Sequence, residues 1–223
     1  MTSDAPKRIR QSDLRIGDTL ICRPAKHTGF GLLIKKASDN PYTHAAICLG
    51  RGLAAESTFR KGVQITPLHM LLERYAHIAV LRHPDAFTHG RPLRLNGFVH
   101  GLIARRAGYA SLLAGSIPIA RRPRVDDSLG VLAKHHEAGS PRIRWTSRNY
   151  FCSQLVVAAL IDCGFIGEGA VPIFHPRSFY PGDFFSDTVF GFSVGYLTRL
   201  PGYGLPADDP LRRIDPIDIF TAA

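Results

Sequence analysis

Cys152, His44 and Glu56 combine the residue types and local settings that acyl-transfer chemistry uses. Cys152 lies in the first turn of a helix predicted over residues 150–160, where apolar residues cover nearly every side and indicate burial. The free N–H groups and positive dipole end of a helix N-terminus favour the thiolate form of a cysteine. A thiolate beside an imidazole is an activated nucleophile, and the backbone N–H of Cys152 would contribute to an oxyanion hole.

The ends of this helix have their own signals. Ser147 or Asn149 is expected to cap its start, and Gly164 is expected to end it directly after Cys163. The cysteine would then lie at the entrance of the domain's central helix.

The other cysteines have a structural interpretation. Free cysteines are among the most buried residue types, so we assign Cys22, Cys48 and Cys163 to the core. The sequence has no Cys-x-x-Cys pair, which argues against zinc and against a disulfide framework. A metal site shared by Cys152 and His44 lacks a third soft ligand nearby in sequence, so we expect no metal and no cofactor.

His44 and Glu56 fall on two predicted strands, residues 42–50 and 53–57, joined by a glycine-rich turn. If the loop is the three residues 50–52, an antiparallel pairing places Glu56 diagonal to His44 on the same face.

The register behind that expectation is specific. Leu49 would face Leu53 and Glu56 would face Ala46, whereas a four-residue loop would move Glu56 to the opposite face. The geometry suits a carboxylate that orients an imidazole. A purely structural polar pair is the alternative, because a partly buried histidine needs a partner.

The remaining elements follow from hydrophobic periodicity and turn residues. Residues 114–141 are rich in Gly, Pro, Ser and Arg and predict an irregular segment. The mixture of elements indicates an α+β fold. Strands are expected over residues 19–23, 62–68, 78–82 and 189–200, and helices over residues 28–37, 68–75 and 95–113.

A chain of 223 residues, 45% of them hydrophobic, is long enough for one domain with a full core. We expect a polar tail over residues 1–13 and a single domain over residues 14–200 with a basic insertion at about 85–145. The Pro-rich tail, residues 201–223, shows no periodicity and is expected to wrap the surface.

Most of the positive charge falls in the insertion. Residues 91–148 hold eleven Lys or Arg and three Asp or Glu, a local charge of +8 out of the formal +10. Such a patch suits an anionic membrane surface or an acidic substrate, and a solvated face is the alternative. Nucleic acid is not expected, because aromatics are sparse among the arginines and no nucleic-acid motif is present.

Targeting signals are absent from the given sequence. No apolar run reaches the ~18 residues of a spanning helix, and the first residues lack the apolar block of a secretory signal. We therefore expect a cytoplasmic protein, unless export uses a non-classical route. The sequence leaves the oligomeric state open.

Several of these features occur together in one known family. The order and context of the motifs resemble the YiiX/YebB-like branch of the NlpC-type, papain-like cysteine hydrolases. That branch is circularly permuted, so the histidine strand precedes the cysteine helix, an order that lecithin retinol acyltransferases share. The resemblance implies an antiparallel sheet or small barrel packed on a central buried helix carrying the cysteine. It rests on Gly17-Asp18, on Tyr42-Thr-His-Ala-Ala-Ile47, on Glu56, on Phe151-Cys-Ser-Gln-Leu-Val156 and on Pro181-Gly-Asp-Phe184.

The resemblance also implies roles for individual residues. Cys152 would be the nucleophile, His44 the general base and later acid, and Glu56 the residue that orients the histidine. Tyr42 and Ser153 are candidates for oxyanion or substrate binding. No metal is required.

The expected function is hydrolysis of an amide or ester bond through a thioester on Cys152, in a cell-wall peptide or a lipid or acyl amide. One alternative is a lipid acyltransferase or phospholipase-like acyl hydrolase at anionic membranes, since the insertion mixes apolar residues such as Phe98 and Leu102 with arginines. Another alternative is a non-catalytic basic binding module on the same fold.

Overall fold

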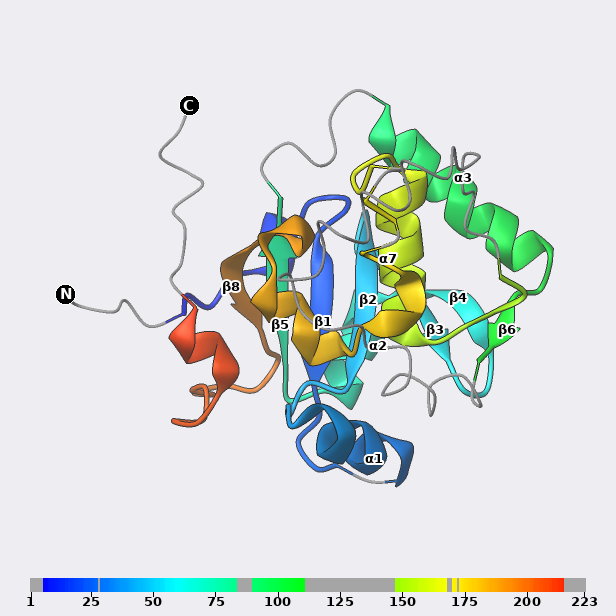
Figure 1. Ribbon diagram of the computed structural model, residues 1–223. Helices are drawn as coiled ribbons and strands as arrows, with labels where there is room; N and C mark the ends of the chain where they lie inside the picture. Colours follow the sequence, from blue (N-terminus) through cyan, green and yellow to red (C-terminus); the bar gives the residue numbers. More distant parts are fainter. Residues whose placement is uncertain are drawn as a thin grey trace.

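An antiparallel sheet of six strands forms the framework of the computed structural model (Figure 1). The structure describes residues 6–27, 29–83, 90–110, 147–167, 170–171 and 173–214. The strands lie in the order β4-β3-β2-β1-β5-β8, so β1 and β2 occupy the middle. Their bounds are β1 Thr19–Arg23, β2 His44–Gly50, β3 Leu53–Thr58, β4 Gly62–Pro67, β5 His77–Arg82 and β8 Phe192–Leu197.

Helix α7 packs on β2 and β3, and α3 lies against α7 (Figure 1). A short parallel pair, β6 and β7, leads into α7. This arrangement confirms the predicted α+β class with a mostly antiparallel sheet. The helices are α1 Gly29–Ser38, α2 Leu68–Arg74, α3 Arg91–Ala104 and α7 Cys152–Asp162; the pair is β6 Gly108–Tyr109 and β7 Asn149–Tyr150; short 3-10 helices span Gln11–Asp13, Pro176–Ser178, Pro181–Ser186, Thr188–Phe190 and Pro210–Arg213.

The buried helix predicted from the sequence is α7, and every residue from Cys152 to Ile161 is buried. Its predicted end is confirmed: Gly164 has φ +70°, and the Phe165 N–H donates to the Leu160 carbonyl at 2.8 Å. A position with this positive φ favours glycine, and the change in backbone angle ends the helix there.

The predicted caps at the start of α7 are wrong. Asn149 belongs to β7, and the Ser147 hydroxyl donates to the Asn149 carbonyl at 2.7 Å. The residue before the helix is Phe151, whose N–H donates to the side chain of Gln154 at 3.3 Å. A glutamine in the first turn therefore satisfies the N–H of the residue before the helix, whereas a capping Ser or Asn would accept from an N–H of the first turn.

The β2–β3 hairpin reaches the predicted register by a different route. Gly50, rather than Leu49, pairs with Leu53, and the loop is Arg51-Gly52, both with positive φ as a tight hairpin turn requires. A bulge between Cys48 and Gly50 leaves Leu49 unpaired. The extra residue offsets the shorter loop, and Glu56 lies opposite Ala46 as expected.

Helix α3 corrects another prediction. It spans Arg91–Ala104 rather than residues 95–113, because Arg106 adopts φ +53° and the chain then enters β6. The predicted irregular segment, residues 114–141, lies outside the described residues. Among the helices that the structure describes, none combines the length and apolar character needed to cross a bilayer.

Both ends of the described chain pack on the sheet, and the rest of the expected tails, residues 1–5 and 215–223, lies outside the described residues. The Ile9 N–H donates to the Tyr196 carbonyl and the Tyr196 N–H donates to the Lys7 carbonyl, each at 2.9 Å, so residues 7–9 run beside β8. In the C-terminal part, Leu211 and Asp209 are fully buried. Ile9 and Leu211 are buried and belong to the hydrophobic core clusters.

Gly195→Ala should destabilise the fold. Gly195 has φ +130°, and a Cβ there would meet the Lys7 carbonyl oxygen and Ile9. We expect a loss of about 2 kcal/mol or more in the free energy of unfolding, measured by urea denaturation. The control is Gly97→Ala on exposed α3, where nothing lies within 4 Å, and which should gain about 0.5–1 kcal/mol. Equal stability of the two variants would contradict the docking of residues 7–9 on β8.

Candidate active site

His44 and Glu56 meet on neighbouring strands, as the predicted register requires. His44 begins β2 and Glu56 lies inside β3. The His44 Nε2 atom is 2.8 Å from Glu56 Oε2. The two side chains therefore form the imidazole–carboxylate pair that the sequence predicted.

The Glu56 carboxylate is buried and its second oxygen is fully used. Oε1 accepts hydrogen bonds from Gln64 Nε2 at 3.0 Å, Thr66 Oγ1 at 2.6 Å and Arg74 Nη2 at 2.6 Å. Burial raises the pKa of Glu56, but the bonds from His44, Thr66 and Arg74 outweigh it and hold the pKa well below its usual range. Glu56 is therefore ionised at neutral pH.

These partners of Glu56 were not among the predicted site residues. Gln64 pairs directly with Glu56 across β3 and β4, and Thr66 lies two residues on, so both share its face. The alternation of side-chain direction along β4 could have placed Gln64 and Thr66 on the face of the sheet that carries Glu56. Arg74 comes from α2, and no local pattern in the sequence indicates which carboxylate it reaches.

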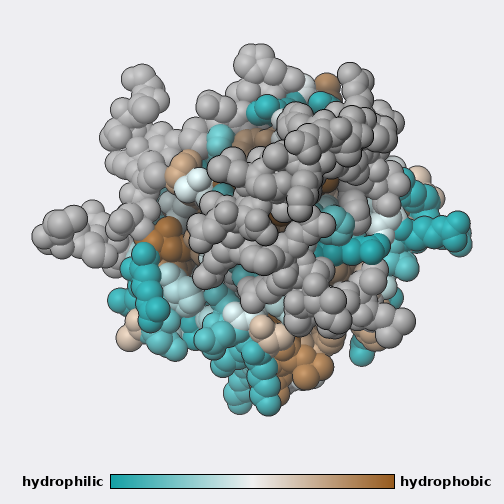
Figure 2. Space-filling view, in the orientation of Figure 1, coloured by the Kyte–Doolittle hydropathy of each residue, from teal (hydrophilic) through white to brown (hydrophobic). Residues whose placement is uncertain are grey.

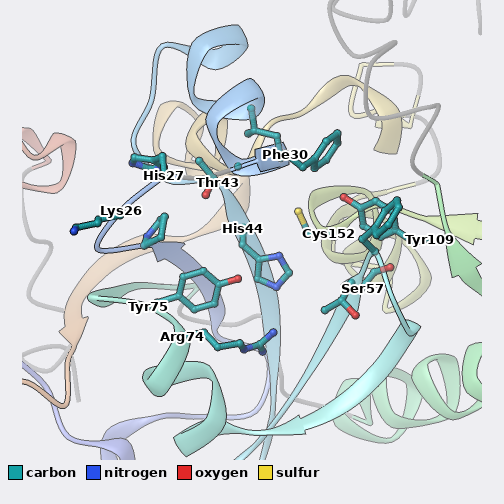
Figure 3. A pocket seen from close by; sticks show the side chains of 15 residues that line it. Lys26, His27, Phe30, Thr43, His44, Ser57, Arg74, Tyr75, Tyr109 and Cys152 are labelled. Carbon is teal, nitrogen blue, oxygen red and sulfur yellow. The ribbon is translucent and has the colours of Figure 1, made fainter.

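Cys152 is the first residue of α7 and lies beside His44 (Figure 3). Burial lowers the pKa of His44, but hydrogen bonds with Cys152 and Glu56 outweigh it and raise the pKa to about 9. Since Nε2 bonds to Glu56, Nδ1 is the ring nitrogen left for Cys152. The ring of Tyr75 stacks on the imidazole with centroids 5.5 Å apart and planes 8° apart, which limits how the imidazole can tilt.

Cys152 and His44 lie at a pocket of about 320 Å³ that has two chemically different walls (Figure 3). Cys152 and His44 line it, and Glu56 lies behind His44. One wall is apolar and aromatic and the other is cationic, and none of the described residues that line the pocket is acidic. The apolar wall contains Phe30, Ile34, Phe59 and Tyr109, and the cationic wall contains Lys26 and Arg74. His27 lies with these cations, but burial and the neighbouring Lys35 lower its pKa and favour its neutral form.

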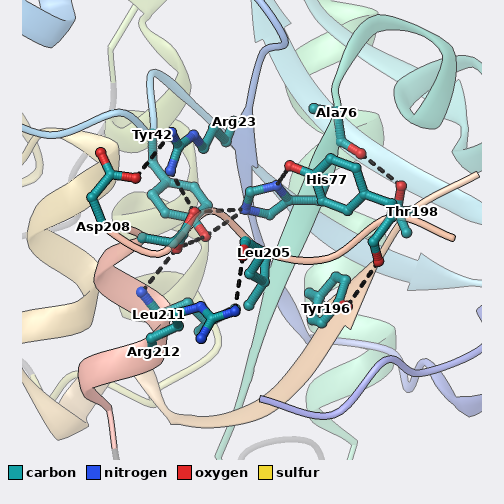
Figure 4. Close-up of polar contacts among 12 residues, drawn as sticks. Arg23, Tyr42, Ala76, His77, Tyr196, Thr198, Leu205, Asp208, Leu211 and Arg212 are labelled. Atoms are coloured by element: carbon teal, nitrogen blue, oxygen red, sulfur yellow. Dashed lines mark hydrogen bonds and ion pairs between the residues drawn. The ribbon is translucent and has the colours of Figure 1, made fainter. Parts of the chain in front are cut away.

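The structure does not bring Tyr42 to the pocket. Its hydroxyl is 2.7 Å from His77 Nε2 and donates to Asp209 Oδ1 at 2.8 Å (Figure 4). The expected oxyanion role of this side chain is therefore wrong. Residues two apart share a face of the sheet only when both lie inside the strand. The sequence predicted a strand from Tyr42, but β2 begins at His44, so the rule does not apply to Tyr42.

The Ser153 side chain also bonds to a group outside the pocket. Its hydroxyl donates to the Phe179 carbonyl at 2.6 Å and it is fully buried. The side chain fastens α7 to the segment before Tyr180 rather than binding substrate, so this expectation is wrong as well.

A second buried network braces the start of β2. Asp209 Oδ2 accepts from Arg23 Nη1 at 2.6 Å and lies 3.2 Å from His77 Nε2 (Figure 4). Burial raises the pKa of Asp209, but bonds from His77 and the Leu211 N–H lower it to about 2. The C-terminal segment is thereby fixed to β1 through Arg23, to β5 through His77 and to Tyr42, which lies two residues before His44.

Metal ligation has no support in the described part of the chain, where no group of three or more His, Cys, Asp or Glu is arranged to hold an ion. All four cysteines are buried and free. Cys22, Cys48 and Cys163 lie in hydrophobic surroundings, as expected of core residues.

Comparisons with known proteins do not add to this picture. A scan against models of protein families finds no match, and a search of curated proteins finds none either. The function has to be argued from the geometry of the site.

The elevated pKa of His44 gives a pH prediction. Its folded pKa of about 9 exceeds the usual 6.5, so the stabilisation from protonated His44 is full below pH 6.5 and is lost as the pH rises through 9. Histidine NMR should show a His44 midpoint near 9. Glu56→Gln should lower that midpoint by about one pH unit or more, since it removes the negative partner. An unchanged midpoint in Glu56→Gln would mean that the carboxylate does not act on the imidazole.

Proposed function

We propose that this protein is a cysteine hydrolase that cleaves an amide or ester bond through a thioester on Cys152. The observation that carries the proposal is that Cys152, at a helix N-terminus, and His44 line one pocket, while His44 also bonds to the buried Glu56. A nucleophile, a proton carrier and an orienting group in this order are the components of acyl-transfer sites.

The first half of the reaction forms the thioester. The Cys152 thiolate attacks the carbonyl carbon of the substrate, and the carbonyl electrons move onto oxygen. The backbone N–H of Cys152, at the start of α7, donates to this oxyanion. When the oxyanion collapses, the bond to the leaving nitrogen or oxygen breaks, and protonated His44 gives that atom its proton.

The second half returns the enzyme to its starting state. Neutral His44 takes a proton from water, and the hydroxide oxygen attacks the thioester carbon. The carbon–sulfur bond breaks, the acid is released and the thiolate of Cys152 is again paired with protonated His44. No electrons are gained or lost, and water is the only co-reactant.

Glu56 supports both halves because it stays charged and fixed. Four hydrogen bonds hold its two oxygens, so the carboxylate cannot turn away when His44 loses its proton. The bond to Nε2 also leaves Nδ1 as the nitrogen that can serve Cys152. Glu56 is a positioning residue in this scheme.

The proposed fold is the circularly permuted papain-like one. In support, the histidine strand β2 precedes the cysteine helix α7 in the chain, and α7 packs on that strand. The six-stranded antiparallel sheet and the buried helix fit the layout that this fold uses.

Cys152→Ala is the direct test. Wild-type protein incubated with a panel of p-nitrophenyl acyl esters and fluorogenic acyl amides should gain the mass of the acyl group on the Cys152 peptide. Cys152→Ala should lose about 10³-fold or more in kcat/KM and should carry no adduct.

The matched control is Cys163→Ala, which removes a buried cysteine at the other end of the same helix. It should keep both the adduct and the rate. Hydrolysis by Cys152→Ala at the wild-type rate would overturn the proposed function.

A further inference from the structure

The outer edge of the pocket carries exposed apolar side chains on two separate elements. Leu33 on α1 is 62% exposed, and Phe59 in the β3–β4 turn is 70% exposed. Phe30, also on α1, is 37% exposed. We call α1 together with residues 59–61 the pocket rim.

Helix α1 is held to the body of the protein by little apolar contact. Of its residues, all of which the structure describes, Ile34 alone is buried, in a cluster with Phe151 and Tyr180. Leu32 and Leu33 both belong to the exposed residues of the protein, at 38% and 62% exposure, so much of their apolar surface is left uncovered by the fold. Figure 2 shows hydrophobic surface over α1 at the lower edge of the molecule, directly beside hydrophilic surface.

The apolar surface of the rim continues into the pocket. The ring of Tyr109 lies between the two parts, with its centroid 6.3 Å from Phe30 and 5.9 Å from Phe59. All three rings line the pocket that holds Cys152 (Figure 3). An apolar chain that enters from the rim would stay in contact with aromatic side chains as far as the cysteine.

The charge around these apolar residues has one sign. Residues 24–38 and 57–63 contain five Lys or Arg and no Asp or Glu. A cationic surface with protruding apolar side chains matches the interface of an anionic membrane, where the cations meet headgroups and the apolar groups enter the acyl boundary. Nucleic acid fits less well, because Leu33 and Phe59 would face solvated phosphates. The cations are Lys26, Lys35, Lys36, Arg60 and Lys61.

We propose that the pocket rim docks on the surface of an anionic lipid membrane. Docking there would open the pocket toward the bilayer, so an acyl chain of a lipid could pass Phe30 and Tyr109 and bring its ester or amide carbonyl to Cys152. The docking stands by itself, whereas the choice of a lipid acyl substrate rests on the proposed function.

Vesicle co-sedimentation tests the docking with full-length protein. Vesicles of phosphatidylcholine with phosphatidylglycerol should retain the wild type, whereas phosphatidylcholine alone should not. Leu33→Asp, and separately Lys35→Glu with Lys36→Glu, should each weaken binding about tenfold or more. Added salt should weaken the wild type, because surface charges are screened.

The controls carry the same chemical changes elsewhere. Leu200→Asp alters an exposed leucine that follows β8, and Arg199→Glu with Arg213→Glu reverses two exposed charges away from the rim. Both should bind like the wild type. Binding that ignores phosphatidylglycerol, equal losses in the rim and control variants, or retention by duplex DNA but not by vesicles would each overturn the docking.

Failure of the docking and failure of the proposed function can be told apart. Cys152→Ala should bind vesicles as the wild type does, because the sulfur does not contribute to the rim. Vesicle binding without any acyl adduct on Cys152 would overturn the hydrolase and leave the docking. An adduct from soluble esters without vesicle binding would overturn the docking and leave the hydrolase.

Discussion

The rest of the site depends on the neutralisation of one buried carboxylate, that of Glu56. A buried charge costs several kcal/mol unless ions and hydrogen bonds surround it. Here His44 meets one oxygen, and Gln64, Thr66 and Arg74 meet the other. Since those partners come from β2, β4 and α2, any change in register or helix placement would leave the charge unpaired. The requirement to satisfy Glu56 thus fixes the elements that hold His44.

The second constraint is the helix that delivers Cys152. Helix α7 is apolar on all sides, so it must be enclosed, and it packs on the same strands that carry His44 and Glu56. Its first residue is Cys152, and that end lies at the pocket. Because the buried helix cannot shift, the Cys152 sulfur and the free N–H groups of the first turn are held in place beside the His44 imidazole.

Sequence reasoning reached those parts of the structure that short-range patterns determine. Alternating strands, the glycine turn and the apolar helix were sufficient to place Glu56 opposite Ala46 and Cys152 at a helix start. Sequence reasoning failed to predict hydrogen-bond partners that lie far away in the sequence. Tyr42 turns to His77 and Asp209, and the second of these comes from a segment without periodicity that we expected on the surface. Leu211 and Asp209 are both fully buried, and no local pattern in the sequence predicts the burial of this segment.

Arg74 changes how the Glu56 carboxylate acts on His44. Glu56 favours protonated His44, and a carboxylate acting on the imidazole alone would hold the proton too tightly for transfer to a leaving group. Arg74 binds the oxygen of Glu56 that His44 does not use, and so offsets part of its negative charge. The same guanidinium reaches the pocket wall beside Tyr75. One side chain thus belongs both to the network that holds Glu56 and to the cationic wall of the pocket, so the wall cannot be altered at Arg74 without altering the charge that acts on His44.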